Sequence, residues 1–79
     1  MVEQGQDQLK LLLRQLRTER DVTQAQLAEQ IGVAQPRIAE IEAGRREVRA
    51  LELFAILEAL GVSMATFWRR WQTLSIDHQ

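Results

Sequence analysis

The segment Val22–Gly44, VTQAQLAEQIGVAQPRIAEIEAG, constrains the fold most strongly because it specifies two short helices around one tight turn. Thr23 and Gln26 have the T-x-x-Q spacing of a capping box, in which each side chain satisfies an unpaired backbone N–H at a helix start. Gly32 falls where a helix commonly ends in a left-handed residue, because glycine carries no Cβ penalty there. A second helix follows at once and ends at Gly44. The segment therefore predicts a helix-turn-helix layout.

The apolar residues of this segment are spaced so that each helix has one buried side. Leu27, Ala28 and Ile31 share a side of the first helix, and Ile38 and Ile41 face the core from the second. Ala28 is small, which suits two helices that cross steeply at a short turn. The outward residues of the second helix are polar and can hydrogen-bond, so the layout presents this helix to a groove.

A further helix is expected before this pair, over roughly residues 8–19. Its buried stripe at i, i+4 and i+7 is Leu9, Leu13 and Leu16. Leu12 lies at the margin of that stripe, and Leu11 lies outside it and is expected to be exposed. A basic loop is expected after the pair, over residues 44–48.

Two more helices are expected after this loop. One covers Ala50–Leu60, and its carboxylates Glu52 and Glu58 are interpreted as a solvated face. The last helix begins after Gly61, which is a helix stop signal. Ser63 caps its start, and its core residues are predicted to be Met64 and Phe67.

These helices predict an all-α fold in one compact five-helix domain. The domain is expected over residues 8–74, after a flexible N-terminal segment of residues 1–7 and before a polar tail of residues 75–79. At 79 residues the chain has the size of one small domain, and no repeat, low-complexity stretch or linker divides it.

The sequence resembles the DNA-binding domain of the Xre/Cro/lambda-repressor-type transcriptional regulators over Leu9–Trp68, about three quarters of the chain. The matching pieces keep their order and spacing: LRTER, TQAQLAEQIGV, QPRIAEIEAGRR and LEALGVSMATF. The resemblance implies a lambda-repressor-like fold that binds double-stranded DNA at specific sequences. A small repressor or antitoxin-type regulator fits a domain without a ligand-binding part.

The exposed side of the second helix of the pair holds the predicted base-contacting residues. Gln35 can pair with adenine and Arg37 with guanine, each through two hydrogen bonds. Pro36 offers only apolar contact, for example to a thymine methyl group. Glu40 can accept from cytosine N4 or exclude wrong sites by repelling phosphates; the alternative is a solvated acid that pairs with Arg37. Ala34 stands where the family usually has a capping serine or threonine, so about 1 kcal/mol of helix stability is missing there.

Three residues are predicted to contact phosphates. Gln24 lies in the first turn of its helix, where unpaired N–H groups and the helix dipole attract anions, and the resemblance implies the same phosphate clamp. Arg45 and Arg46 follow the second helix of the pair, beside the expected path of the sugar-phosphate backbone. The resemblance also implies a structural ion pair between Arg17 and Glu42, with no role as DNA ligands.

The composition weakens the case for a strong nonspecific DNA binder, because the net charge is −1. The same fold serves protein-interaction modules such as antitoxins and adaptors, and that remains the alternative function, with weak or absent DNA binding. No enzyme activity is expected, since the lone histidine is His78 and no catalytic set can be assembled. With no cysteine, neither a thiolate metal site nor a disulfide is expected, and no cofactor is predicted.

Self-association is predicted through the last helix. Trp68, Trp71 and Leu74 lie on a stripe at i, i+3 and i+6 that turns partly outward, and tryptophan is enriched at binding hot spots. A homodimer would supply the paired helices that a two-fold DNA site requires. The N-terminus lacks the pattern of a secretory signal, and the longest apolar run, Leu53–Leu57, is too short to span a bilayer, so a cytoplasmic protein without membrane association is expected.

Overall fold

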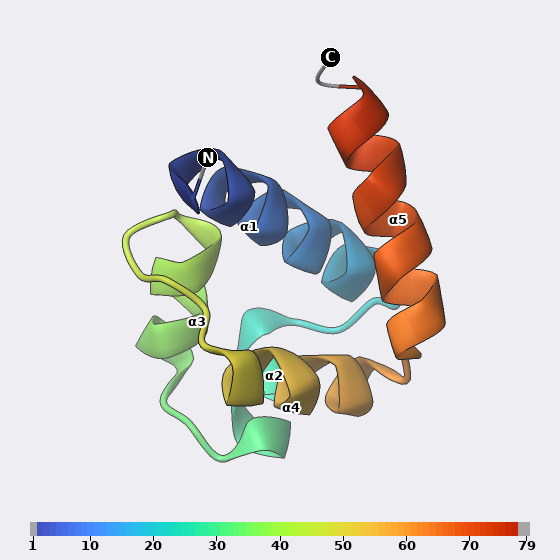
Figure 1. The fold of residues 1–79 in the computed structure, drawn as a ribbon. Coiled ribbons are helices and arrows are strands. Elements are labelled where there is room, and N and C mark those ends of the chain that lie inside the picture. Colours follow the sequence, from blue (N-terminus) through green and yellow to red (C-terminus); the bar gives the residue numbers. More distant parts are fainter. Residues whose placement is uncertain (1, 78–79) are drawn as a thin grey trace.

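Residues 2–77 form five helices, as the sequence predicts (Figure 1). The computed structural model describes the backbone of residues 2–77 and the side chains of residues 5–74. The helices are α1 (Val2–Glu19), α2 (Gln24–Ile31), α3 (Gln35–Glu42), α4 (Ala50–Leu60) and α5 (Met64–Asp77). Helix α2 packs against α3 and α4, while α1 packs against α3 and α5. In Figure 1, α3 and α5 lie at opposite sides of the molecule.

The start of α2 is capped as its sequence predicts. The Thr23 side chain accepts a hydrogen bond from the Gln26 N–H at 3.0 Å, and the Gln26 side chain accepts from the Thr23 N–H at 2.9 Å. Gly32 ends the helix with φ +77°, in the left-handed region that glycine adopts without strain. Ala34 makes no side-chain cap at the start of α3. The α2–α3 unit is therefore fastened at its first helix and in its turn, and less so where α3 begins.

The core is built from side chains of all five helices, together with Val62 between α4 and α5. It consists of Leu9, Leu12, Leu13, Leu16, Leu27, Ala28, Ile38, Ile41, Ile56, Leu57, Leu60, Val62 and Phe67. Leu12 is fully buried, so its placement at the margin of the α1 stripe was wrong: the core extends around that side of the helix. Met64 was also wrongly placed in the core, because 51% of it is exposed in the first turn of α5. Leu11 is exposed, as predicted.

Helix α1 begins at Val2, six residues before the start expected from the leucine stripe. Within this extension, the Gln6 side chain accepts a hydrogen bond from the Val48 N–H at 3.2 Å. The first turns of α1 thus support the loop between α3 and α4. Helix α5 also extends past its predicted end to Asp77, whereas His78 and Gln79 of the predicted tail lie outside the described residues.

Helices α4 and α5 meet at a bend of 109°. The Ser63 side chain accepts from the Thr66 N–H at 3.1 Å, which is the predicted cap of α5. Within residues 2–77, no single helix is long and apolar enough to cross a bilayer.

Candidate nucleic-acid interface

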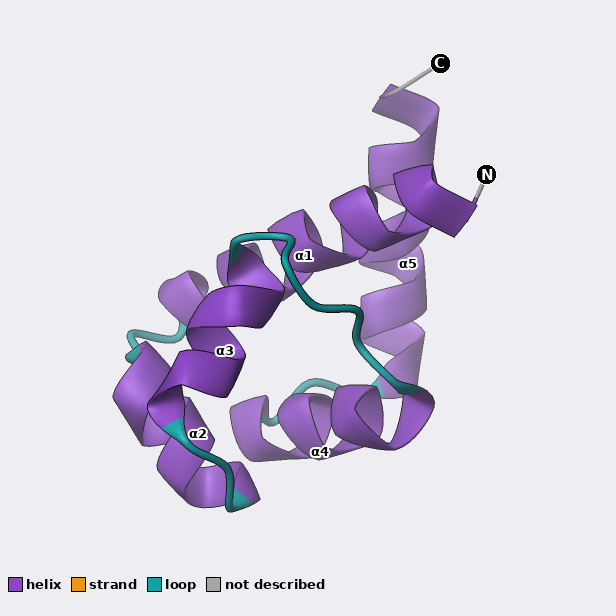
Figure 2. Ribbon diagram, turned by 90° about the vertical axis from the view of Figure 1, so that its left-hand side faces the viewer, coloured by secondary structure: helices purple, strands orange, loops and turns teal. Residues whose placement is uncertain are grey.

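Helix α3 separates a buried side from an exposed one. Ile38 and Ile41 are buried in the core, while Gln35, Pro36 and Glu40 are exposed. This is the division that the spacing of the segment predicts, and Figure 2 shows α3 on the side of the molecule that faces the viewer. Three of the four predicted base-contacting residues therefore lie on one accessible surface.

Arg37, the fourth of these residues, lies against α4. Its Nε donates to Oε2 of Glu52 at 2.6 Å, and its Nη2 forms an ion pair with the same oxygen. The other carboxylate oxygen of Glu52 accepts from the Arg49 N–H at 3.1 Å. The interpretation of Glu52 as part of a solvated face was therefore wrong. Burial of the Glu52 carboxyl acts to raise its pKa, but the hydrogen bonds from Arg49 and Arg37 hold that pKa below its ordinary value.

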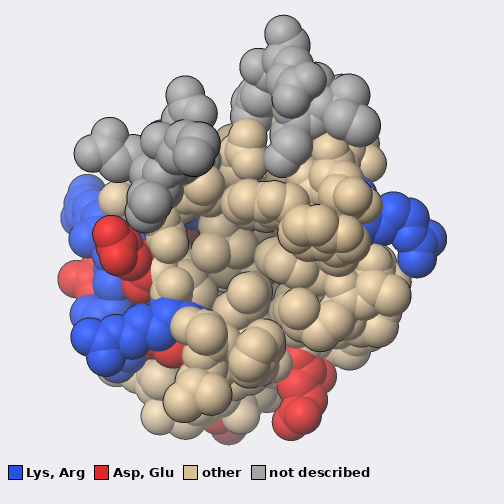
Figure 3. Space-filling model, in the orientation of Figure 1, with Lys and Arg blue, Asp and Glu red and all other residues tan. Residues whose placement is uncertain are grey.

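The loop after α3 carries Arg45 and Arg46, and both are exposed. Arg46 lies 4.0 Å from the Glu40 carboxylate, between Nη1 and Oε1, so the acid on α3 pairs with this arginine rather than with Arg37. The loop begins at Gly44, which has φ +79°, and the Lys10 side chain lies directly over that glycine. Figure 3 shows basic side chains gathered at the edge where α3 and this loop lie, with acidic ones among them.

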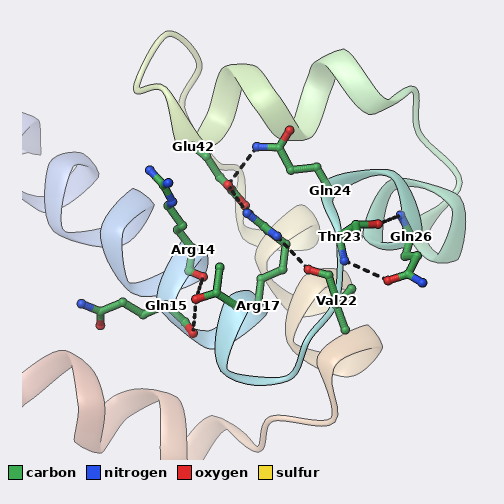
Figure 4. A network of polar contacts seen from close by, with 9 residues as sticks. Arg14, Gln15, Arg17, Val22, Thr23, Gln24, Gln26 and Glu42 are labelled. Carbon is green, nitrogen blue, oxygen red and sulfur yellow. Dashed lines mark hydrogen bonds and ion pairs between the residues drawn. The ribbon is translucent and has the colours of Figure 1, made fainter.

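A polar network joins the end of α1, the start of α2 and the end of α3 (Figure 4). Arg17 donates two hydrogen bonds to the Glu42 carboxylate, at 2.7 Å from Nε and 2.8 Å from Nη2. Its Nη1 donates to the Val22 carbonyl at 2.7 Å. The arginine and the glutamate are only 11% and 6% exposed in their side chains, so the pair lies almost entirely within the protein. The structure thus brings together the two residues of the expected structural pair.

Gln24 belongs to the same network. Its amide Nε2 donates to Oε1 of Glu42 at 3.0 Å, so its side chain points toward the end of α3 (Figure 4). Burial acts to raise the pKa of the Glu42 carboxyl, but the hydrogen bonds from Arg17 and Gln24 and the charges of Arg17 and Arg14 hold it below its ordinary value. The Glu42 carboxylate is therefore ionised near neutral pH. It holds the side chain of Arg17 on α1 and that of Gln24, the predicted phosphate-contacting residue on α2.

The three residues of the predicted dimer surface differ in exposure. Trp68 is 57% exposed, whereas Trp71 and Leu74 are partly buried against the core. Trp71 stacks on Phe67 with ring centroids 6.2 Å apart and an angle of 30° between the rings. Of the predicted stripe, Trp68 is thus the member with the most accessible surface.

All the exposed large apolar side chains of the described residues lie on α1, α4 and α5. They are Leu11, Leu51, Phe54, Met64 and Trp68. Leu51 and Phe54 share a side of α4 at i and i+3, and Met64 and Trp68 share a side of α5 at i and i+4. In Figure 3 the middle of the front shows no charged side chain, and the basic and acidic ones lie around its edges. We give the name neutral face to the exposed apolar surface of α4 and α5, which carries Leu51, Phe54, Met64 and Trp68.

Two residues beside the predicted interface, Glu52 and Gln6, make contacts that were not predicted from the sequence. Glu52 is the third residue of α4, the position from which a glutamate reaches back to a helix start, and that spacing was a usable signal. Its second partner, Arg37, is 15 residues away, and no local pattern indicates such a pairing. Gln6 was assigned to a flexible segment, although it is held on the loop that carries the arginines.

The helix-turn-helix family model matches residues 13–67. The wild-type restriction-modification controller protein C.Esp1396I has a similar fold, with a TM-score of 0.88 and 23% identity, over 92% of this chain and 95% of that chain. The same controller protein, as a tetramer in complex with its natural 35 base-pair operator, gives a TM-score of 0.81 and 24% identity, over 86% of this chain and 90% of that one.

A higher sequence identity is found with the clp gene regulator ClgR from C. glutamicum. It is 37% identical, with a TM-score of 0.71, and the match covers 76% of this chain and 77% of that chain. No curated protein sequence matches the chain significantly. Because the family model spans residues 13–67 and the likeness to ClgR covers three quarters of both chains, the protein belongs to the helix-turn-helix family of the Xre/lambda-repressor type, whose members are DNA-binding transcriptional regulators.

Proposed function

We propose that the protein binds double-stranded DNA at specific sequences through α3 and regulates transcription as a homodimer. The observation that carries this proposal is the surface of α3, where Gln35, Pro36 and Glu40 are exposed beside the loop arginines Arg45 and Arg46. Hydrogen-bonding side chains on a projecting helix suit base edges in a major groove, and the arginines beside them suit phosphates.

Each of the four predicted base-contacting residues of α3 has a chemical role in this proposal. Gln35 pairs with adenine through N6 and N7, and Arg37 pairs with guanine through O6 and N7. Pro36 contacts a thymine methyl group. Glu40 accepts from cytosine N4 and repels phosphates in misplaced complexes, which favours correct sites over wrong ones.

Phosphate contacts set the affinity and the register. Arg45 and Arg46 neutralise backbone charge beside the end of α3, and Gln24 contributes a neutral donor at the start of α2. In the structure the Gln24 amide donates one of its two hydrogens to Glu42, which fixes the side chain. The second amide hydrogen can then donate to a phosphate.

The likeness to other regulators supports the proposal. One similar controller protein is recorded as a tetramer in complex with its operator, and ClgR is described as a gene regulator. A regulator of this kind acts by binding rather than by catalysis. Because it must reach the chromosome, we place it in the cytoplasm.

The neutral face is the proposed dimer surface. Trp68 on α5 is 57% exposed and Leu51 on α4 is 80% exposed, while Trp71 and Leu74 on α5 are partly exposed. A second copy of this chain fits such a surface because a two-fold interface places the same uncharged patch against itself. It also leaves the α3 of each copy accessible, since α3 lies away from the neutral face (Figures 1 and 2).

Selection of bound sequences from a random pool of duplexes tests the DNA proposal. We expect one enriched, two-fold symmetric site, and affinity that falls with salt by about 0.9 log units per log unit for each neutralised phosphate. Arg45→Ala should weaken binding to all sequences similarly. Arg69→Ala is the matched control, because Arg69 is an exposed arginine on α5, across the molecule from α3. A pool without any enriched site at low salt would contradict the proposal.

Sedimentation of the Trp68→Ala variant tests the dimer. We expect a lower dimer fraction and weaker operator binding with a nearly unchanged melting temperature. Trp71→Ala serves as the contrast, because its ring stacks on Phe67 and its loss should lower the melting temperature. A wild-type protein that stays monomeric at high concentration, both alone and on DNA, would contradict the proposed homodimer.

A protein-interaction module is the second candidate, and the neutral face is the observation that favours it. In that function the exposed apolar side chains bind a different protein and DNA binding is weak or absent. Failure to select a DNA site, together with a monomeric wild-type protein, would favour this candidate over the first.

A further inference from the structure

Glu52 contacts the guanidinium of Arg37 from one side only. The Arg37 Nε donates to Oε2 of Glu52, and its Nη2 forms an ion pair with the same oxygen. The other oxygen of Glu52 is occupied by the Arg49 N–H. The carboxylate therefore links three points: the side chain of α3, the backbone at the start of α4, and its own helix.

The contact with Glu52 leaves the other edge of the guanidinium available to donate hydrogen bonds to a ligand. An arginine side chain has five N–H donors in a fixed plane, and Glu52 uses those on the Nε side. The two terminal nitrogens still offer a pair of parallel donors, which is what a bidentate contact with guanine O6 and N7 requires. The exposures agree with this orientation, since the Arg37 side chain is 35% exposed and the Glu52 side chain behind it is 16% exposed.

We propose that Glu52 is the positioning residue that makes Arg37 a selective guanine reader; this inference rests on the proposed function. A long arginine side chain loses considerable rotamer freedom when it is fixed on a base, and less when it is already held. The carboxylate also offsets the charge of Arg37, so that the arginine contributes little to nonspecific attraction by phosphates. Glu52 thus lowers nonspecific affinity and raises discrimination.

The Glu52→Gln variant separates these effects, because glutamine keeps an oxygen that can accept from the Arg49 N–H but loses the charge. The measured quantity is the ratio of affinities for the selected site and for a site in which the guanine pair read by Arg37 is replaced. We expect this ratio to fall about tenfold, within the range of a bidentate base contact. Affinity for random-sequence duplex should stay constant or rise. Glu58→Gln, on an exposed residue of the same helix, is the control for the change in net charge and should leave the ratio unchanged.

Arg37→Ala distinguishes a failure of this inference from a failure of the proposed function. If Arg37→Ala abolishes the discrimination and Glu52→Gln leaves it intact, the positioning role of Glu52 is overturned while Arg37 remains the reader. If Glu52→Gln strengthens binding to every sequence equally, Glu52 acts through its charge alone and the inference also falls. If Arg37→Ala leaves the discrimination unchanged, both the reader and its positioning residue are rejected. Should Glu52→Gln fail to fold, Glu52→Asp withdraws the carboxylate by one methylene and gives the same readout.

Discussion

Helix α3 is held near its two ends by two arginine–glutamate pairs of similar chemistry and different burial. At its end, Glu42 binds Arg17 of α1, and these side chains are 6% and 11% exposed. Near its start, Arg37 binds Glu52 of α4, and these are 35% and 16% exposed. Two donors of Arg17 reach different oxygens of its partner, whereas Arg37 reaches one oxygen only.

The difference shows how burial decides what an ion pair does. A buried pair cannot exchange its partner for water, so losing one member strands a charge and the pair becomes essential to the fold. A partly exposed pair is screened, contributes little to stability, and can present its outer donors to a ligand. The Arg17–Glu42 pair is thus suited to structure, and the Arg37–Glu52 pair to recognition.

The largest expected effect is on the buried pair. Arg17→Met should lower the free energy of unfolding by about 3–5 kcal/mol, because it leaves the Glu42 carboxylate without its main partner. Arg17→Met combined with Glu42→Leu should recover part of that loss. Thermal and urea unfolding measure both variants. A single variant as stable as the wild type, or losses that simply add in the double variant, would remove the distinction between the two pairs.

A smaller effect is expected in the acid range. The fold lowers the pKa of the Glu42 carboxyl, so this group stabilises the folded state above its unfolded-state value, about 4.3. That contribution is lost as the pH falls through the lower folded-state value. Urea unfolding between pH 6 and 2 should therefore show stability falling below about pH 5, and less steeply in Glu42→Gln. Glu52→Gln should flatten the curve less, since its carboxyl is shifted in the same direction but more exposed. Equal flattening in both variants would contradict the comparison.

The smallest effect on stability is expected at the exposed pair. Arg37→Met should lower the free energy of unfolding by at most about 1 kcal/mol, and the difference should shrink in 1 M salt, where charges are screened within about 3 Å. Unfolding in low and high salt measures this directly. A salt-independent loss as large as that of Arg17→Met would mean that both pairs are structural.

Local patterns in the sequence predicted most of the fold. The capping residues and the spacing of the core side chains located all five helices, because these signals act within one or two turns. The same reasoning misplaced Met64, since an apolar residue in a first turn can face either way and only packing decides. It also placed the start of α1 too late. The first turns of α1 lack the leucine stripe, and Gln6 in these turns contacts the loop between α3 and α4.

The site was predictable in its residue types and less so in its partners. The exposed positions of α3 followed from its periodicity, and the Arg17–Glu42 pair from the family resemblance. The contacts of Glu52 with Arg37 and of Gln24 with Glu42 join residues 15 and 18 positions apart. Such pairings depend on how helices cross, which no local spacing contains.

Fastening α3 at both ends has a consequence for the DNA. Because these two pairs restrain α3 relative to α1 and α4, we expect part of the adjustment to fall on the duplex, which bends or twists until both half-sites meet the two α3 helices of a dimer. The stiffness of base pairs that the protein never touches then enters the binding energy. We therefore expect affinity to depend on the sequence of the spacer between half-sites, and to favour flexible pyrimidine–purine steps over stiff A-tracts there. Titration of operators that differ only in this spacer measures the effect, and equal affinities would show that α3 yields instead of the DNA.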